Sequence, residues 1–534
     1  MSDEKTLSCR TVYLLLATIS CGLMLARIVT VESKTVGPEK RHTPFLSAND
    51  RSRWCTVRAL VDEGTYAIDS MQEGKDKNWR TIDLVRHRGP DGRQHYYSSK
   101  PPLFPTLIAG EYWVLRQLTG TSIATSPLYV GRILLITTNM IPLVLYFVLL
   151  ACWIERSSAT DFGGIFVFAV ATFGTFLTTF SVTINNHLPA AVSVLVATYC
   201  AQRVWYEGRR EIRYFVIAGC GAGFAAANEL PALSFLAMLA AGLAWKAPRQ
   251  ALMGYLPAVL LIGAAFFATN FLAHGDWRPP YAHRSDGQVL FEEDFEEDAG
   301  PLDMLETGRV PAEIHDGLAG GSGSPARELS LRKRYAGAGW ELSDRRRGER
   351  YAIVRQGEVL QVRSWDHWYD FEGSYWTSDD RRGVDLGEAS RGSYALHVLV
   401  GHHGLFSLTP VWILSLIGLG IMLGQGPSGQ RALASLILVL TVVCLVFYIG
   451  LRPVGDRNYG GVCSGFRWLF WFTPLWLIAL LPAADFVSRN RWLRFFALLL
   501  LLVSVFSASY PWHNPWTHPW LFQYWESLGW IAYP

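Results

Sequence analysis

Long apolar runs alternate with short polar connections along most of the chain. Each run approaches the roughly 20 residues that an α-helix needs to cross the hydrocarbon core of a bilayer. The runs lie near residues 11–31, 128–153, 162–184, 188–205, 213–229, 231–245, 252–273, 405–424, 431–451, 467–485 and 493–510. This pattern predicts an all-α polytopic membrane protein with about 11 transmembrane helices.

Arginine and lysine collect in three of the short connections, and the positive-inside rule places these connections in the cytoplasm. They are residues 202–213, 246–249 and 489–494. The predicted spans alternate consistently only if the segment Leu103 to Leu118 does not cross the membrane. This segment also carries Glu111 and Arg116, each of which costs roughly 2.5–3.5 kcal/mol at the centre of a membrane helix. We therefore expect it to form a helix that lies on the outer membrane surface.

Composition agrees with a membrane protein and excludes other classes. Half of the 534 residues are hydrophobic, 17% are charged, and the formal net charge is +3. A charge this small, carried by scattered residues, does not indicate a nucleic-acid-binding surface. Most of the eight cysteines lie in or beside apolar runs without paired spacing, so we expect neither a disulfide framework nor a zinc site. A bridge between Cys55 and Cys463, which both fall outside, stays open.

The predicted topology divides the chain into three parts. Residues 1–273 form a membrane core that includes a first extracytoplasmic loop at 32–127. Residues 274–404 form a large second extracytoplasmic loop, interpreted as a partly flexible lid, and residues 405–534 form C-terminal transmembrane helices and an outward tail. The first apolar run has no small-residue cleavage site, so we expect an uncleaved first helix.

Both outer loops carry local structural signals. In the first loop, Trp54, Val57 and Val61 share one face of a predicted helix, and Gly64 is a plausible stop. The second loop has an acidic run from Glu292 to Asp298, a Gly/Ser stretch from Gly317 to Ser324 and basic clusters at 332–334 and 345–350. The segment from Tyr351 to Val362 is typical of a short strand pair.

Asp50 is the first candidate for chemistry. It lies just outside the first span and precedes Arg51 and Arg53. An aspartate before an apolar periodic segment is typical of a helix N-cap, and the residue alone favours capping and catalysis equally. A membrane-proximal carboxylate close to an arginine can also accept a proton from an acceptor hydroxyl, and the two roles are compatible.

Lys100 is the second candidate. Pro101 and Pro102 follow it directly, which excludes a helix through this point and keeps the lysine backbone extended. A rigid mount suits an ammonium group that stabilises charge on a departing lipid phosphate. The alternative, which the residue alone favours, is a lysine that snorkels to the headgroups.

Two further groups of polar residues fall at outer ends of spans. Asn186 and His187 can line a cavity that faces the first loop, although a satisfied interfacial histidine is an equal alternative. In the segment from Arg457 to Trp468, glycines permit close backbone approach, and Tyr459 and Arg467 are candidates to hold a sugar or a phosphate. The alternative is an ordinary turn at the headgroup level.

The remaining histidines give no metal signal at sequence level. His402 and His403 are adjacent, as are Asp366 and His367, but no third ligand at a metal-like spacing accompanies either pair. We expect no metal-dependent step and no cofactor.

Together these strings resemble the GT-C superfamily of polytopic glycosyltransferases, and in particular the bacterial branch with the lipid A aminoarabinose transferase and the protein mannosyltransferase-like proteins. In that branch the first outer loop carries Asp-Glu-x-Arg-Tyr, which Asp50, Arg53 and Trp54 match in part. It also carries Lys-Pro-Pro-Leu, which residues 100–103 match.

A late motif supports the same resemblance, since a Gly-x-x-x-Gly-x-Arg-Tyr/Trp-like string before a late span is common among the relatives. Here Gly461, Gly465, Arg467 and Trp468 are similar to it. The resemblance covers about residues 1–230 well. It implies a GT-C-like fold with juxtamembrane helices in the first outer loop. It also implies a location in the bacterial inner membrane, with the active site on the extracytoplasmic face.

The resemblance also implies the reaction. The donor is a polyprenyl-phosphate-linked sugar, the acceptor is extracytoplasmic, and transfer is inverting and metal-independent. Asp50 acts as base, Lys100 and Arg467 stabilise the leaving phosphate together with Arg53, and His187, Asn186 and Tyr459 bind substrate.

The sequence departs from the family at two motif positions. Arg51 replaces the second acidic residue, and Asn186 and His187 stand where relatives often place an aspartate. Two hypotheses of other classes therefore stay open: a transporter or flippase of a lipid-linked glycan, and a non-catalytic scaffold whose second loop binds a partner. A transporter predicts polar residues near mid-membrane and related halves, whereas here polar residues gather at the outer ends and no halves repeat.

Overall fold

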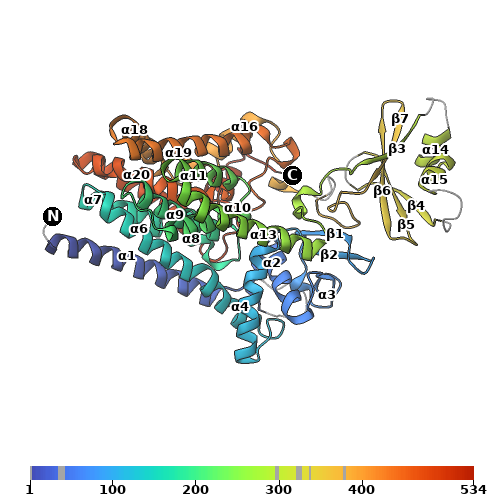
Figure 1. Cartoon of the computed structure of the whole chain (residues 1–534), viewed down its shortest axis with the longest axis horizontal. Coiled ribbons are helices and arrows are strands. Elements are labelled where there is room, and N and C mark those ends of the chain that lie inside the picture. The colour runs from blue at the N-terminus through green and yellow to red at the C-terminus, as the bar shows by residue number, and fades with distance from the viewer. Residues whose placement is uncertain are drawn as a thin grey trace. The chain divides into compact units, whose positions relative to one another are not determined.

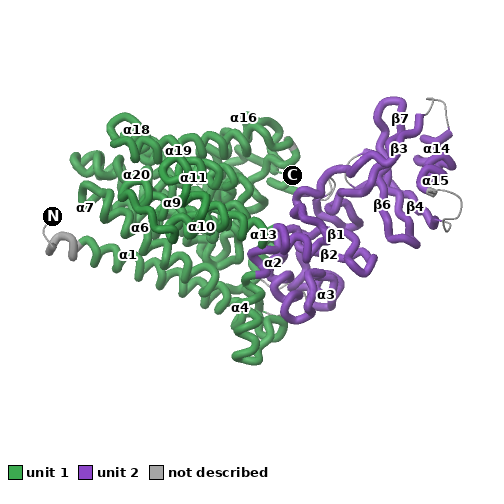
Figure 2. The backbone as a smooth tube through the Cα atoms, in the orientation of Figure 1, with its two compact units in different colours: residues 1–50, 107–266, 382–534 green, residues 51–106, 267–381 purple. Residues whose placement is uncertain are grey.

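The computed structural model forms two compact units, which are described separately (Figure 2). Unit 1 comprises residues 1–50, 107–266 and 382–534, and unit 2 comprises residues 51–106 and 267–381. The structure describes residues 3–33, 42–294, 300–319, 327–335, 338–376 and 381–533. The predicted three-part division of the chain stays a prediction.

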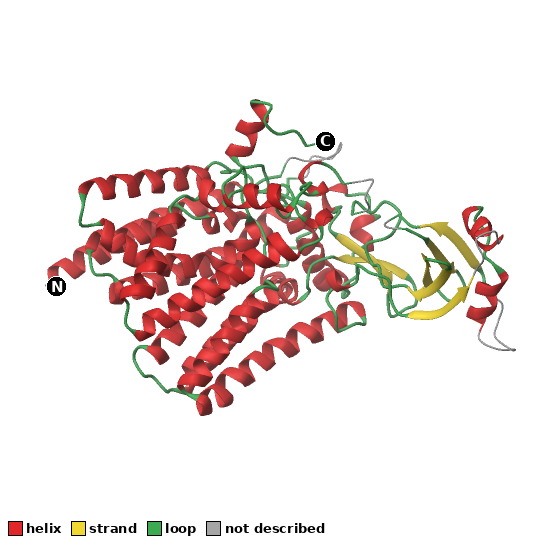
Figure 3. Cartoon of the chain, turned by 90° about the horizontal axis from the view of Figure 1, so that it is seen from above, coloured by secondary structure: helices red, strands yellow, loops and turns green. Residues whose placement is uncertain are grey.

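Unit 1 is helical (Figures 1 and 3). Its helices are α1 (Asp3–Thr30), α5 (Pro127–Leu135), α6 (Ile141–Ser157), α7 (Asp161–Phe173), α8 (Phe176–Thr179), α9 (His187–Trp205), α10 (Ile212–Asn228), α11 (Ala232–Lys246), α12 (Pro248–Gln250), α16 (Arg391–Leu399), α17 (Leu405–Leu408), α18 (Trp412–Gln425), α19 (Ser428–Leu445), α20 (Thr473–Val487), α21 (Arg491–Ser509) and α22 (Trp520–Ser527). Three more, α2 (Ala48–Arg58), α4 (Leu103–Thr119) and α13 (Leu256–His274), have residues in both units. Each predicted apolar run coincides with one or more of these helices.

Seven helical segments among the described residues are long and apolar enough to cross a membrane. They are Cys9–Thr30, Pro127–Ser157, Asp161–Val182, Pro248–His274, Ser428–Leu451, Arg467–Val487 and Arg491–Ser509. Ala232–Lys246 and Trp412–Gln425 are shorter apolar helices. The chain is therefore a helical integral membrane protein, and the count of eleven crossings stays a prediction.

Packing distinguishes buried from lipid-facing helices. Helix α20 is almost wholly buried and contacts α7, α9 and α18. At Gly418 the backbones of α18 and α20 come so close that a Cβ atom would lie 1.8 Å from the Ala479 carbonyl oxygen. In contrast, Leu14 on α1 and Leu502 on α21 are 69% and 64% exposed. Outward leucines of this kind are favourable in lipid and indicate the membrane-facing surface.

The predicted run at 405–424 is interrupted. Helix α17 ends at Leu408, and α18 begins at Trp412. Pro410 explains the break, because a proline removes one backbone donor and disfavours helical geometry at the preceding Thr409.

The start of α7 is held by a buried carboxylate from α20. Asp485 accepts hydrogen bonds from the backbone amides of Ala159 and Thr160 at 2.8 and 2.9 Å. It also accepts from the hydroxyls of Ser158 and Thr160 at 3.0 and 2.7 Å. Thr160 in turn caps α7 by accepting from the Gly163 amide. These bonds satisfy donors that a helix N-terminus leaves without partners.

Helix α2 confirms the signals read in the first outer loop. It continues through a π-helical turn at Ala59–Glu63 and stops at Gly64, which has a left-handed φ of 70°. Trp54 and Val57 are fully buried. The segment expected to be a surface helix forms α4, and its place at the membrane surface stays a prediction.

Unit 2 contains two antiparallel sheets, so the all-α description does not extend to it (Figure 3). A hairpin pairs β1 (Leu84–Arg88) with β2 (Gln94–Ser98), next to the short helix α3 (Asp69–Gln72). The second sheet has the order β3-β7-β6-β5-β4. Its strands are β3 (Val289–Asp294), β4 (Leu329–Lys333), β5 (Trp340–Asp344), β6 (Glu349–Gln356) and β7 (Val359–Ser364), accompanied by α14 (Gly300–Glu306) and α15 (Ala312–Ala319).

The strand pair expected between Tyr351 and Val362 is confirmed as β6 and β7. The acidic run begins in β3, but its members 296–298 lie outside the described residues. Most of the Gly/Ser stretch, residues 320–324, also lies outside them.

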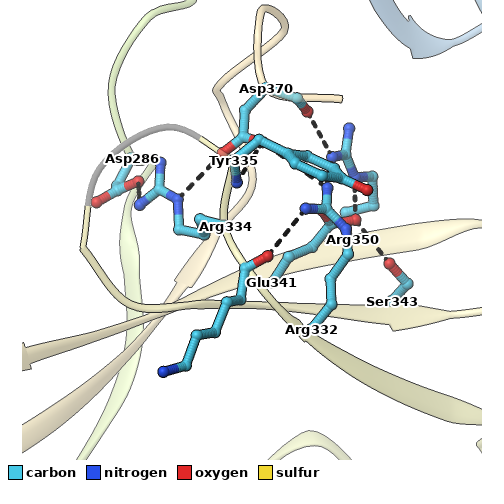
Figure 4. A network of polar contacts seen from close by, with 9 residues as sticks. Asp286, Arg332, Arg334, Tyr335, Glu341, Ser343, Arg350 and Asp370 are labelled. Atoms are coloured by element: carbon cyan, nitrogen blue, oxygen red, sulfur yellow. Dashed lines mark hydrogen bonds and ion pairs between the residues drawn. The ribbon is translucent and has the colours of Figure 1, made fainter. Parts of the chain in front are cut away.

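Arg334 and Arg350, one from each basic cluster of the second loop, pair with acidic residues within unit 2 (Figure 4). Arg334 pairs with Asp286 at 2.7 Å and with Asp370 at 3.4 Å. Arg350 donates to Glu341 at 2.7 Å and to the Asp370 carbonyl oxygen at 2.8 Å. Burial lowers the pKa of Arg350 to about 10. This network joins β5 and β6 to the loop that follows β7.

Candidate active site

Asp50 forms half of a capping box at the start of α2. Its Oδ1 accepts from the Ser47 amide at 3.0 Å, and the Asp50 amide donates back to the Ser47 hydroxyl at 3.2 Å. This reciprocal pair satisfies two of the amides that a helix start leaves without partners. The N-cap role predicted for Asp50 is therefore wrong: Ser47 is the N-cap, and Asp50 is the third helical residue and pairs with it.

The other carboxylate oxygen of Asp50 faces the membrane core of unit 1. Asp50 Oδ2 accepts from the Thr183 hydroxyl at 2.8 Å, and Thr183 Oγ1 accepts from Trp516 Nε1 at 3.1 Å. Asp50 and Thr183 are fully buried, and Trp516 is 9% exposed. A residue in the first turn of α2 thus contacts Thr183, just before α9, and Thr183 in turn contacts a residue of the C-terminal segment.

His187 is the first residue of α9 and lies between the Glu229 carboxylate and the Arg467 guanidinium. Its Nδ1 contacts Glu229 Oε1, and Arg467 Nη1 lies 2.8 Å from its Nε2. A guanidinium carries only donors, so Nε2 accepts and the ring proton resides on Nδ1, where Glu229 accepts it. Asn186 donates a second hydrogen bond to Glu229 at 2.6 Å. His187, Asn186 and Arg467 are therefore brought together, as the sequence predicts.

Arg467 connects the His187–Glu229 pair to Trp516. Its guanidinium donates twice to the Gly460 carbonyl oxygen, at 3.0 and 2.8 Å, and lies 5.1 Å from the Trp516 ring centroid. Gly460 has a φ of 89°, and a Cβ atom there would lie 2.4 Å from Arg467 Nε. Only glycine permits this approach.

These contacts define one continuous set of side chains in unit 1, which we term the buried polar chain. It consists of Asp50, Thr183, Trp516, Arg467, His187 and Glu229. Two carboxylates and one guanidinium, all at most 9% exposed, are held in low-dielectric surroundings. Chemically, the chain offers a proton acceptor and a cation suited to an anionic group.

Lys100 and Arg53 belong to unit 2. Lys100 Nζ forms an ion pair with Asp83 Oδ2 at 3.0 Å, and the Lys100 amide donates to the Ser98 hydroxyl at 3.2 Å. Arg53 is 4% exposed on α2. Lys100 lies in a bend between β2 and α4, whereas the sequence predicted an extended backbone there. Its partner Asp83 was not anticipated.

Tyr459 lies in a different set of contacts from Arg467. It is fully buried, donates to Glu388 Oε1 at 2.6 Å and stacks on His403 at 4.0 Å between ring centroids. The segment from Arg457 to Trp468 therefore supplies Gly460 and Arg467 to the buried polar chain and Tyr459 to a neighbouring histidine cluster.

Sequence reasoning missed Glu229, Thr183 and Trp516. The sequence does single out Glu229, because burying a carboxylate at the end of an apolar run costs free energy, and such a residue is therefore a candidate for function. Thr183 and Trp516 left no such signal, since a single hydroxyl or indole at a helix end has no distinctive pattern. Cys463 forms no disulfide bond among the described residues, so the bridge left open between Cys55 and Cys463 is not present.

An apolar cavity of about 360 Å³ lies at the other end of α9 from His187. Its lining includes Trp153, Trp205, Phe235, Leu239 and Leu436. The buried polar chain and this cavity therefore occupy opposite ends of the same helix.

No protein-family model matches the sequence, and comparison with curated proteins finds no relative.

Proposed function

We propose that this membrane protein is a glycosyltransferase of the GT-C type with about eleven spans. It transfers a sugar from a polyprenyl-phosphate donor to an acceptor on the extracytoplasmic face of a bacterial plasma membrane. The observation that carries the proposal is the buried polar chain, in which the Asp50 carboxylate and the Arg467 guanidinium are linked through Thr183 and Trp516. The resemblance of the loop motifs to the GT-C superfamily supports the same reading.

The chemistry assigned to the chain needs a base and a cation. Asp50 takes the proton of the acceptor hydroxyl, and the acceptor oxygen forms a bond to the anomeric carbon while the bond from that carbon to the phosphate oxygen breaks. The polyprenyl phosphate leaves with the electron pair of that bond, and Arg467 stabilises its charge. For Lys100 and Arg53 the same role rests on the resemblance of the loop motifs alone. The transfer inverts the anomeric centre and needs no metal.

Thr183 explains how Asp50 is prepared for this role. Its hydroxyl donates to the Oδ2 atom that is not engaged by the Ser47 amide. An acceptor hydroxyl that replaces Thr183 at this oxygen reaches a carboxylate already fixed by the capping box. Such preorganisation lowers the cost of orienting the base.

The second candidate is a transporter of a lipid-linked glycan, and the apolar cavity beyond Trp205 is the observation that favours it. A cavity lined by apolar side chains can hold a hydrocarbon chain.

Reconstitution separates the two functions. Purified protein is placed in vesicles with a polyprenyl phosphate that carries a radiolabelled sugar, and the vesicles are supplied with an extract of envelope acceptors. The proposal expects label to become covalently attached to a new molecule. Movement of labelled lipid between leaflets without such attachment would instead establish the transporter and contradict the transferase.

A further inference from the structure

Among the described residues, one group has the side-chain types and spacing of a metal site. It consists of Glu388, which precedes α16, His397 on α16 and His402 just after that helix. One potential ligand atom from each residue lies within 4.8 Å of the other two. Glu388 is 7% exposed and His402 is fully buried.

The Glu388 carboxylate is surrounded by hydroxyl groups. Oε1 accepts from Tyr459 and from Tyr533 at 2.6 Å each, and Oε2 accepts from Ser393 at 3.1 Å. Within the described part of the chain, no basic side chain lies at ion-pair distance from it. Hydroxyl dipoles alone compensate a buried negative charge poorly, so a cation beside Glu388 is favourable.

The imidazole of His402 is oriented as a metal ligand would be. Its Nδ1 lies 2.6 Å from His403 Nδ1, so one of these nitrogens donates and the other accepts. The Tyr533 hydroxyl gives its proton to Glu388, so without an ion His402 Nε2 donates to Tyr533 at 2.9 Å. An ion at Nε2 would leave the ring proton on Nδ1, where His403 can accept it. A ligand histidine that donates its other N–H to a neighbour is the usual arrangement around protein-bound metals.

His397 contributes an independent observation. Its Nδ1 is buried and has no hydrogen-bond partner among the described residues. A Cβ atom at Gly401 would lie 2.6 Å from this nitrogen, so only glycine lets the loop come so close. The ring also stacks on His402, with centroids 4.1 Å apart.

We propose that Glu388, His397 and His402 bind a divalent cation of the zinc type. Two imidazoles and one carboxylate with an open fourth position form a donor set that Zn²⁺ prefers. Ligand atoms around tetrahedral zinc lie roughly 3.3 Å apart, so small side-chain rotations bring these three into range. The ion holds the loop after α16 against Tyr459 and the C-terminal segment, and it takes no part in sugar transfer.

The test is the metal content of the full-length protein, purified in detergent through a tag without histidine. Mass spectrometry of the elements should find about one zinc ion per chain. Glu388→Gln and His402→Ala should each reduce this at least about tenfold, whereas His315→Ala, which removes an exposed histidine of α15, should leave it unchanged.

Two further measurements do not depend on the folding of the ligand variants. Wild-type protein stripped by a chelator should take up one zinc ion in competition with a chromophoric chelator, and its unfolding temperature should rise. Tyr533→Phe, which removes a hydroxyl but no ligand, should keep the ion. A stripped wild type that binds no zinc, or a Glu388→Gln protein that binds as much as the wild type, would overturn the proposal.

Discussion

Replacing Glu229 by glutamine should disturb the whole buried polar chain, although the side chain keeps its shape. Glu229 now accepts hydrogen bonds from His187 and from Asn186. Both donors meet the same oxygen, Oε1, so a glutamine whose carbonyl takes the place of Oε1 can keep both hydrogen bonds, and the substitution chiefly removes the negative charge.

The expected cost follows from these contacts. A hydrogen bond to a charged group contributes about 1.5–3 kcal/mol and one between neutral groups about 0.5–1.5 kcal/mol, so a neutral acceptor weakens both bonds. Removing the carboxylate also takes away a negative charge near Arg467, and breaking a directly paired buried ion pair costs about 3–5 kcal/mol. Because His187 separates Glu229 from Arg467, we expect less than the sum, namely a loss of about 2–4 kcal/mol in the free energy of unfolding.

Denaturant titration of the detergent-solubilised protein measures this loss, with the exposed Glu526→Gln as a matched control. A double-mutant cycle between Glu229→Gln and Arg467→Met then tests the relay through His187. We expect a coupling energy above about 0.5 kcal/mol, although the two side chains are joined only through the ring. Strictly additive losses, or a Glu229→Gln variant as stable as the control, would refute the reasoning.

Three further predictions concern other parts of the structure. Thr183→Val should lower the free energy of unfolding by about 1–3 kcal/mol, because Trp516 Nε1 loses its acceptor; an unchanged denaturation curve would contradict this. Asp485→Ala should cost about 2–4 kcal/mol, since two backbone amides at the start of α7 lose their partner, and thermal unfolding in detergent measures the loss. Burial lowers the pKa of His87 in β1 to about 4, whereas the unfolded chain binds a proton at this residue below about pH 6.5. The free energy of unfolding should therefore fall as the pH is lowered from about 6.5 to about 4, with a loss of about 2 kcal/mol at pH 5. Hydrogen exchange of the hairpin should depend less steeply on pH in a His87→Gln variant.

The membrane helices were predictable because a single property determines them. An apolar run near the thickness of a bilayer must satisfy its own backbone, and a helix is the form that does so. The interruption at Pro410 follows from the proline, but whether the chain resumes as a helix depends on packing against α20, which no local pattern records.

The sheets of unit 2 were less accessible to sequence reasoning. Strand β3 includes Glu292, Glu293 and Asp294, and acidic residues are uncommon in strands. Its pairing with β7 spans more than sixty residues of the chain, and such long-range partners leave no local periodicity. Only β6 and β7, which are adjacent in sequence and carry alternating apolar residues, gave a recognisable signal.

The candidate site was predictable in part, because some of its residues interrupt the apolar pattern of the membrane helices. Asp50, His187 and Arg467 stood out as charged or polar residues beside apolar runs. The sequence left an N-cap role and a catalytic role for Asp50 equally open, and the structure assigns the cap to Ser47 and the third helical position to Asp50. The contact of Thr183 with Trp516 joins residues more than three hundred positions apart, so only the folded chain reveals it.

The most direct test of the proposed transferase is the single-turnover rate of covalent sugar transfer by Asp50→Asn. Asparagine keeps an oxygen for the Ser47 amide, but its amide group then faces the Leu46 amide and the Thr183 hydroxyl, and it cannot take a proton from an acceptor. We expect the rate to fall by about 10²–10⁴-fold at unchanged donor binding, while Asp316→Asn on the exposed face of α15 stays at the wild-type rate. A well-folded Asp50→Asn protein that transfers sugar as fast as the wild type would contradict the account.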